Sequence, residues 1–289
     1  MPLGVITLAF DPVVELSETS SVRVETIALA VVLFLGLILA ARMALITPSI
    51  GPYVPAPGLR FDDLVFILVG AVPGAIAGGR LGYVLNHLDF YRDNPAAILD
   101  PAQGGLTLTL AVPLGILSGG FIARLLGAPV GRWLHAAAFP LLFVLAAGKL
   151  IGVLGATGQG APSDVPWATA YAGAGPWGSL AAEIASHPAQ VYEAILVGLA
   201  VAGLAAVGRI EVIARRDGAA MFAAIGLWAI ARFLVALTWR DPAAFGPLRM
   251  EQLLDLGLLA VAGVGLIERA RAPLEAPVEP RVDVGARLA

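Results

Sequence analysis

Runs of about 20 apolar residues recur along the chain, and this feature constrains the fold more than any other. A helix of about 20 residues crosses the roughly 30 Å of hydrocarbon in a bilayer. Inside lipid the backbone must hydrogen-bond to itself, so such runs form helices and not open strands. Only 13% of the residues are charged, about half of the usual share in soluble domains, so most of the surface must face lipid. The sequence therefore predicts an all-α, polytopic membrane protein.

Seven of these runs are predicted to cross the bilayer within a single transmembrane domain, residues 1–267. The Gly/Ala/Pro-rich stretch 155–188 is predicted to be a small periplasmic insert, and the tail 268–289 a disordered cytoplasmic segment. Acidic residues precede the first cation, Arg23, so the first run is predicted to be a retained helix and not a signal peptide. The predicted helices cover residues 24–43, 64–85, 106–126, 134–154, 189–207, 219–239 and 252–267.

The distribution of cations predicts the orientation, because cytoplasmic segments are enriched in Lys and Arg. Only four arginines fall in the segments on one side of the membrane: Arg23, Arg92, Arg240 and Arg249. Eleven fall on the other side: Arg42, Arg60, Arg124, Arg132, Arg209, Arg215, Arg216, Arg269, Arg271, Arg281 and Arg287. We therefore expect the N-terminus outside and the C-terminus in the cytoplasm.

Several classes of function are disfavoured by composition. The chain has no cysteine, which excludes a disulfide, a thiolate nucleophile or a thiolate metal site of its own. It has no basic tract for nucleic acid, and no two of its three histidines have the spacing of metal ligands. Neither a metal nor another cofactor is therefore predicted.

Three cations lie inside predicted helices, at one depth. Arg80, Lys149 (the only lysine) and Arg232 lie five to seven residues before the outer ends of their helices. This places them about 7–10 Å below the outer surface. A charge inside a bilayer costs at least about 2.5–3.5 kcal/mol, so it usually has a partner or a function. The three cations predict one site for an anion that enters from the membrane, with phospholipid phosphate as the first candidate.

Two alternative explanations remain open for these residues. Long cationic side chains can reach individually for the headgroups, without forming a site. The glycines beside the cations, at positions 78, 79, 82, 148 and 152, suit close approach of a ligand, but they suit plain helix packing equally well.

Five motifs resemble those of the prolipoprotein diacylglyceryl transferase family. "GGRLGYVL" at 78–85 is similar to a GGR-containing helix end of the family, and Gly104-Gly105 to a glycine pair further along. "SHPAQVYEA" at 186–194 resembles the R-H-P-S-Q-L-Y-E segment. "ARFLVALTWRDP" at 231–242 resembles F-R-x-x-V-E-F-x-R, and "RMEQLLDL" at 249–256 resembles S-M-G-Q-x-L-S.

The resemblance implies a function and its partners. The family, of the bacterial inner membrane, transfers diacylglycerol from phosphatidylglycerol to the cysteine thiol in the lipobox of exported prolipoproteins. The nucleophilic cysteine belongs to the substrate. Phosphatidylglycerol and prolipoprotein signal peptides are therefore the implied partners. The resemblance also implies a lipid site that includes Gly104, Gly105 and Gly160.

The chain departs from the family pattern at several positions. The family signature G-R-x-G-N-F-x-N-x-E-x-x-G corresponds to "GKLIGVLGATGQG" at 148–160. Lys149 replaces the arginine and Thr157 the glutamate, while Gly152 and Gly155 replace the two asparagines. The residues at three other motif positions are also changed: Thr109 for a histidine, Trp228 for a tyrosine and Ala236 for a glutamate.

Further candidates lie at the start of the fifth predicted helix. His187 could stand near the headgroup site with Gln190 and Tyr192, or could cap the helix and hold the insert. Glu193 could pair with a site cation or act as a base. We predict catalytic roles for Lys149, Arg232, His187 and Glu193. His87 could contact substrate, while His135, next to Trp133, is predicted to be an interfacial anchor.

Three functions follow from these patterns. The first is the diacylglyceryl transfer, with Arg80, Lys149 and Arg232 holding phosphate. The second is a catalytically impaired family member that binds phospholipid as a scaffold or as a subunit of a membrane complex. The third is a small-solute transporter, which predicts discontinuous helices and paired half-repeats; the sequence shows no convincing repeat.

Overall fold

The computed structural model describes residues 5–47, 59–100, 102–173, 175–214 and 216–271. Within them, seven helices are long and apolar enough to cross a membrane. This confirms the predicted fold class. The seven helices are α1 (Val24–Ile46), α2 (Phe61–Asn86), α4 (Leu108–Leu125), α5 (Val130–Gly155), α6 (Ala189–Val207), α8 (Ala219–Val235, continued by η2, Ala236–Thr238) and α9 (Met250–Arg271).

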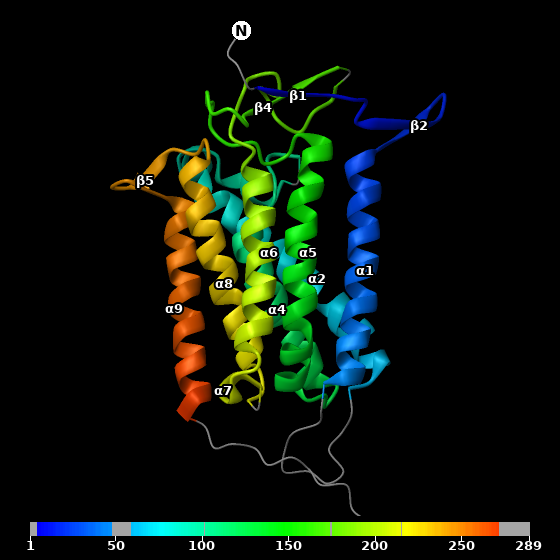
Figure 1. Ribbon diagram of the computed structural model, residues 1–289, viewed down its shortest axis with the longest axis vertical. Helices are drawn as coiled ribbons and strands as arrows, with labels where there is room; N and C mark the ends of the chain where they lie inside the picture. Colours follow the sequence, from blue (N-terminus) through cyan, green and yellow to red (C-terminus); the bar gives the residue numbers. More distant parts are fainter. Residues whose placement is uncertain (1–4, 48–58, 101, 174, 215, 272–289) are drawn as a thin grey trace, which may run out of the picture. The chain divides into compact units, whose positions relative to one another are not determined.

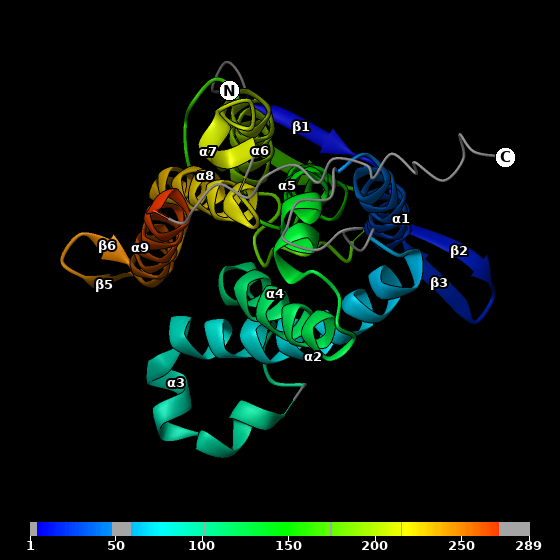
Figure 2. The same cartoon turned by 90° about the horizontal axis from the view of Figure 1, so that it is seen from below.

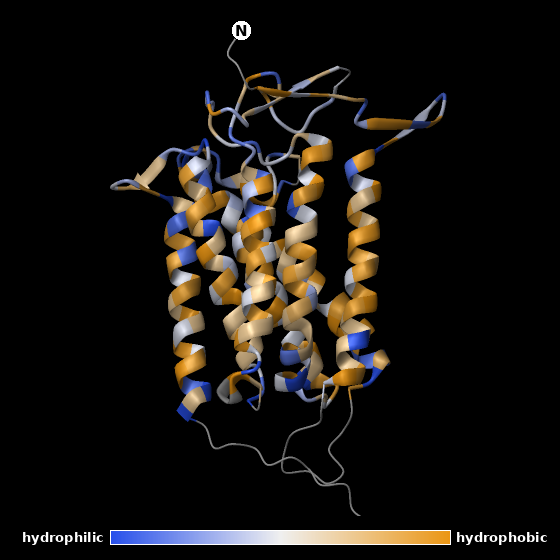
Figure 3. Cartoon of the chain, viewed as in Figure 1, coloured by the Kyte–Doolittle hydropathy of each residue, from blue (hydrophilic) through white to orange (hydrophobic). Residues whose placement is uncertain are grey.

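Apolar side chains cover the outside of these helices. Phe34 of α1 is 61% exposed and Leu117 of α4 is 68% exposed, which suits contact with lipid chains. Figure 3 shows that the helices are hydrophobic over most of their length. Hydrophilic residues interrupt α5, α8 and α9 toward one end, and these interruptions include the candidate site.

Contacts divide the chain into two compact units. The first unit consists of the described residues of Met1–Leu39, Phe139–Ala205 and Ala224–Ala260. The second consists of those of Ala40–Ala138, Ala206–Ala223 and Val261–Ala289.

In the first unit a short two-stranded sheet lies beyond the ends of the helices. Strand β1 (Ile6–Ala9) pairs in parallel with β4 (Thr169–Ala172), as Figure 1 shows. Tyr171 of β4 forms a small core with Ala156 and Ala182, against which Phe10 and Trp177 pack. Two hairpins also occur, formed by β2 (Val13–Ser17) with β3 (Ser20–Arg23) and by β5 (Ala243–Phe245) with β6 (Leu248–Arg249).

In the second unit α2 and α4 pack side by side (Figure 2). Glycines allow this approach: a Cβ added at Gly74 or Gly78 would meet the backbone of α4, at Leu114 or Leu110. The Thr107 N–H also donates to the Gly79 carbonyl at 3.0 Å. The unit also contains three short helices: α3 (Leu88–Asp93), η1 (Pro95–Leu99) and α7 (Glu211–Ala214).

The connecting segments differ from the sequence-based expectation. Residues 86–105, which connect two of the predicted helices, contain the further helices α3 and η1. The insert 155–188 contains β4. The predicted tail begins at Glu268, but α9 continues to Arg271. The rest of the tail, 272–289, lies outside the described residues. The prediction of a single domain over 1–267 stays a prediction.

Candidate active site

A network of buried charges surrounds Arg232 in the first unit. The guanidinium Nη1 lies 3.1 Å from Glu193 Oε1 on α6, and Nη2 lies 2.6 Å from Glu251 Oε2 on α9. The Nε atom is 3.5 Å from Asp255 Oδ1, one turn further along α9. All four residues are buried. The planar guanidinium thus faces three carboxylates with three different nitrogen atoms, whereas a lysine has one.

Two tryptophans enclose the same guanidinium. Its central carbon is 5.3 Å from the centre of the Trp228 ring and 5.0 Å from that of Trp239. Such contacts between a cation and an aromatic ring are favourable where water is excluded. Arg232 is therefore held by carboxylates at its nitrogen atoms and is close to two rings.

Glu193 joins Arg232 to the second cation. Its other oxygen, Oε2, lies 2.9 Å from Lys149 Nζ on α5. The Lys149 side chain is 23% exposed, while that of Arg232 is 3% exposed. Lys149 is therefore the cation of this network that an anion from outside can reach.

The network contains more acidic groups than basic ones. Within the described part of the chain, three carboxylates (Glu193, Glu251 and Asp255) face two cations, so full ionisation leaves one excess negative charge. Removing ions from water costs several kcal/mol each unless partners compensate. Arg232 on α8 therefore helps to hold α6 and α9 in place through its ion pairs, in addition to any role in the reaction.

Polar side chains continue from this network toward the end of α5. Gln190, one turn before Glu193 on α6, is buried and donates from Nε2 to the Tyr171 hydroxyl at 3.1 Å. The hydroxyl of Thr157, just beyond α5, donates to Glu25 Oε1 on α1 at 2.6 Å. Burial raises the pKa of the Tyr171 phenol, and the nearby negative charge of Glu25 raises that pKa further.

His187 and Tyr192 lie together at the start of α6. His187 Nδ1 is 3.4 Å from the Tyr192 hydroxyl, which also accepts a hydrogen bond from the indole N–H of Trp167. Gly160 donates its N–H to the His187 carbonyl at 2.8 Å, and a Cβ added there would approach His187 to 2.9 Å. His187 thus helps to hold the insert, which was one of its two predicted roles.

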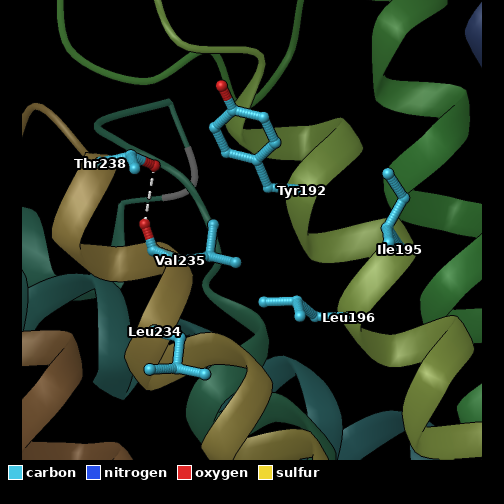
Figure 4. Close-up of a pocket in the computed structure, with 6 residues that line it drawn as sticks. All are labelled: Tyr192, Ile195, Leu196, Leu234, Val235 and Thr238. Carbon is cyan, nitrogen blue, oxygen red and sulfur yellow. Dashed lines mark hydrogen bonds between the residues drawn. The ribbon is translucent and has the colours of Figure 1, made fainter.

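A cavity of about 310 Å³ lies between α6 and α8, below the Tyr192 hydroxyl (Figure 4). Its wall is almost entirely apolar, and the Thr238 hydroxyl donates to the Val235 carbonyl at 2.8 Å. The lining residues are Tyr192, Ile195, Leu196, Leu234, Val235 and Thr238.

Arg80, the third predicted cation, belongs to the second unit. Its Nε donates to the Ile98 carbonyl at 2.7 Å, and Nη2 donates to those of Ala97 and Asp100 at 2.6 and 2.9 Å. Its guanidinium carbon lies 5.9 Å from the centre of the Tyr83 ring and 5.4 Å from that of Tyr91. These contacts tie the end of η1 to α2.

The predicted glycine pair lies beside the same aromatic residues. Gly104 has a φ of +109°, in the region that favours glycine. An added Cβ at Gly105 would approach the Tyr83 ring at 3.3 Å.

Other residues singled out from the sequence also lie in this unit. The exposed ring of His87 stacks on Tyr83, with ring centres 4.2 Å apart. Thr109 is fully buried. Arg132 pairs with Asp217 in this unit, and His135 lies one turn from Arg132 on α5.

We expect Arg80→Gln to loosen the segment formed by α3 and η1. The variant loses charge-assisted hydrogen bonds worth about 1.5–3 kcal/mol each, so the amides of this segment should exchange about 10- to 100-fold faster. Hydrogen exchange read by mass spectrometry measures the change. Arg92→Gln, which removes only an exposed ion pair with Asp89, is the control. Equal exchange in both variants would show that Arg80 does not tie down the segment.

Comparison with known proteins identifies the family. A model of the prolipoprotein diacylglyceryl transferase family matches residues 13–268. The chain belongs to this family.

Relatives named phosphatidylglycerol–prolipoprotein diacylglyceryl transferase match over most of their length. The protein of Beijerinckia indica subsp. indica is 30% identical over 285 residues, 94% of this chain and 98% of the relative. That of Geobacter sulfurreducens is 32% identical over 224 residues, 74% and 81% of the two chains. That of Pseudomonas putida is 33% identical over 227 residues, 72% and 76%. The resemblance found in the motifs is therefore confirmed, and the chain is a multi-pass protein of the bacterial inner membrane.

The structure brings together part of the predicted transferase site. Lys149 and Arg232 share Glu193, while Arg80 belongs to the other unit, so its place beside them stays a prediction. Each of the three cations does lie six residues before the end of its helix. The helices of Arg80, Lys149 and Arg232 end at Asn86, Gly155 and Thr238, respectively.

Two acidic residues of the network, Glu251 and Asp255, were missed from the sequence. They occupy the glycine and the last serine of the family's S-M-G-Q-x-L-S pattern. Their spacing of four residues places both on one face of α9, and two carboxylates on one face of an apolar helix are a signal for a buried cation. Glu25 was missed as well, because its contact with Thr157 joins positions 132 residues apart.

Proposed function

We propose that this chain transfers the diacylglyceryl group of phosphatidylglycerol to the thiol of the lipobox cysteine in exported prolipoproteins. The observation that carries the proposal is the match to transferases so named, over 94% of this chain in the case of Beijerinckia indica. The proposed partners are phosphatidylglycerol and the signal peptides of prolipoproteins.

The proposed reaction has three requirements. The cysteine thiol gives up its proton, and the sulfur forms a bond to a glycerol carbon. The bond from that carbon to the phosphate oxygen breaks, and glycerol phosphate leaves with the electron pair. A cation placed at the leaving oxygen stabilises the charge that develops there. The partly exposed ammonium of Lys149 supports its assignment to this role, and Arg232 holds Glu193, which positions Lys149.

We propose an outside N-terminus and a cytoplasmic C-terminus, as the cation distribution predicts. In this orientation the candidate site lies in the outer half of the bilayer. A lipobox cysteine follows the apolar segment of its signal peptide, so it reaches the site at the outer surface. The apolar cavity beside Tyr192 supports a lipid substrate, since its wall is suited to an acyl chain.

Product formation tests the proposal. Purified protein in lipid nanodiscs is incubated with phosphatidylglycerol and a synthetic lipobox peptide, and mass spectrometry detects the thioether-linked diacylglyceryl peptide. We expect product from the cysteine peptide and none from a peptide with serine in its place. The Geobacter sulfurreducens relative is the positive control. If this chain binds phospholipid but gives no product under conditions in which the relative does, the result would instead support the alternative of a catalytically impaired family member that acts as a phospholipid-binding scaffold.

A further inference from the structure

Glu25 lies in the first turn of α1 and contacts the segment that follows α5. Its Oε1 accepts a hydrogen bond from Thr157 Oγ1 at 2.6 Å. Thr157 is itself fixed, because its N–H donates to the Gly152 carbonyl at 2.9 Å. A side chain at Gly155 would collide with the Glu25 carboxylate, so the glycine leaves room for it. The contact is therefore built into the end of α5.

This contact places a carboxylate where the motif has lost one. The signature pattern has a glutamate at the position of Thr157, and the chain has no acidic residue anywhere in the matching stretch 148–160. Glu25 brings a carboxylate to the Thr157 hydroxyl from a different helix. The carboxylate at this point of the site therefore comes from α1.

Glu25 differs from the three carboxylates of the Arg232 network in its partners. Glu193, Glu251 and Asp255 each face Lys149 or Arg232, so a proton on any of them would weaken a buried ion pair. Among the described residues, no ion pair includes Glu25. Its hydrogen-bond partner is a neutral hydroxyl, so Glu25 can take up a proton without breaking an ion pair.

Three other polar or charged side chains lie near Glu25: Arg23, Tyr171 and Gln190. Arg23, two residues earlier, donates from Nη2 to the Pro176 carbonyl at 2.7 Å. The Tyr171 phenol is close enough for the charge of Glu25 to raise its pKa. Gln190 lies against the same turn, 3.6 Å from the Cβ position of Gly152, and its Oε1 has no hydrogen-bond partner in the described part of the chain.

The position of Glu25 also suits an arriving thiol. Gly152 lies one turn beyond Lys149 on α5. A Cβ added at Gly152 would lie 2.9 Å from the Thr157 hydroxyl oxygen, so this turn is close to the partner of Glu25. The first turn of α1 and the last turn of α5 lie at the same end as β4 (Figure 1). With the proposed orientation this is the outer end, where a lipobox cysteine leaves the bilayer.

We propose that the Glu25 carboxylate accepts the proton of the substrate thiol. This inference rests on the proposed function. The S–H proton moves to Glu25, and the sulfur electron pair forms the bond to the glycerol carbon. The bond from carbon to phosphate oxygen breaks, and its electron pair leaves on glycerol phosphate toward Lys149. The proton returns to solvent from Glu25 after the product departs.

The pH dependence of Glu25→Gln tests the inference. The amide keeps the size of the side chain and can still accept the Thr157 hydrogen bond. We expect the transfer rate to fall about 100-fold or more at pH 7, with binding of phosphatidylglycerol vesicles unchanged. The rate of the variant should then rise about tenfold per pH unit toward the thiol pKa of about 8.5, because the thiolate now forms in solution.

Two further variants complete the experiment. Glu25→Asp keeps a carboxylate and should retain a rate at pH 7 well above that of Glu25→Gln. Glu15→Gln, at an exposed position of β2, should behave as the unchanged protein. A wild-type rate in Glu25→Gln at pH 7, or a loss that high pH does not reverse, would overturn the role of Glu25 while the transfer activity stands. Absence of product from the unchanged protein would overturn the proposed function, and the inference with it.

Discussion

Arg232→Met is expected to lower the free energy of unfolding by about 3–5 kcal/mol, because it leaves buried carboxylates without their shared cation. The methionine fills much of the same space but removes the ion pairs with Glu193, Glu251 and Asp255. Unfolding in detergent by a chemical denaturant, followed by tryptophan fluorescence, measures the loss. Arg92→Gln removes an exposed ion pair and should change the stability by about 1 kcal/mol or less.

Asp255→Asn separates the effect of charge from that of packing. Three carboxylates face two cations, so removing one negative charge balances the network. We expect a much smaller loss of stability than for Arg232→Met. If Asp255→Asn unfolds the protein as readily, charge balance does not organise this part of the fold.

Lys149→Ala is expected to reduce the transfer rate about 10²- to 10³-fold, the usual effect of removing one group that stabilises a developing anion. The fold should persist, because Glu193 keeps its ion pair with Arg232. Rates with a lipobox peptide and binding of phosphatidylglycerol vesicles are measured side by side. A loss of turnover that exceeds any loss of binding indicates a role in the reaction itself.

Lys149→Arg is the matched control for this variant. It keeps the positive charge and introduces the residue that the signature pattern has at this position, with two donors for one phosphate. We expect it to retain activity. Unchanged turnover in Lys149→Ala would contradict the role that we propose for the lysine.

The sequence predicted the membrane-spanning helices well, because apolar runs of this length have one structure in lipid. It also predicted that Glu193 could pair with a site cation, since both lie inside apolar helices where a charge needs a partner. Helix ends were less accurate, as α9 shows by extending to Arg271 through charged residues. Charged residues at the membrane surface do not mark the end of a helix.

The contacts that sequence reasoning missed join distant positions. β1 and β4 are four residues each and lie more than 150 residues apart, so neither signals its partner. Glu25 falls within the first predicted helix, and nothing local in the sequence connects it to Thr157. The α9 carboxylates were overlooked because their partner, Arg232, lies on another helix.

An experimental structure with phosphatidylglycerol bound in a nanodisc tests the central claim most directly. We predict that the lipid phosphate lies within hydrogen-bonding distance of Lys149 Nζ, while Arg232 keeps its three carboxylates. A phosphate held elsewhere, with Lys149 paired to Glu193 alone, would contradict the account.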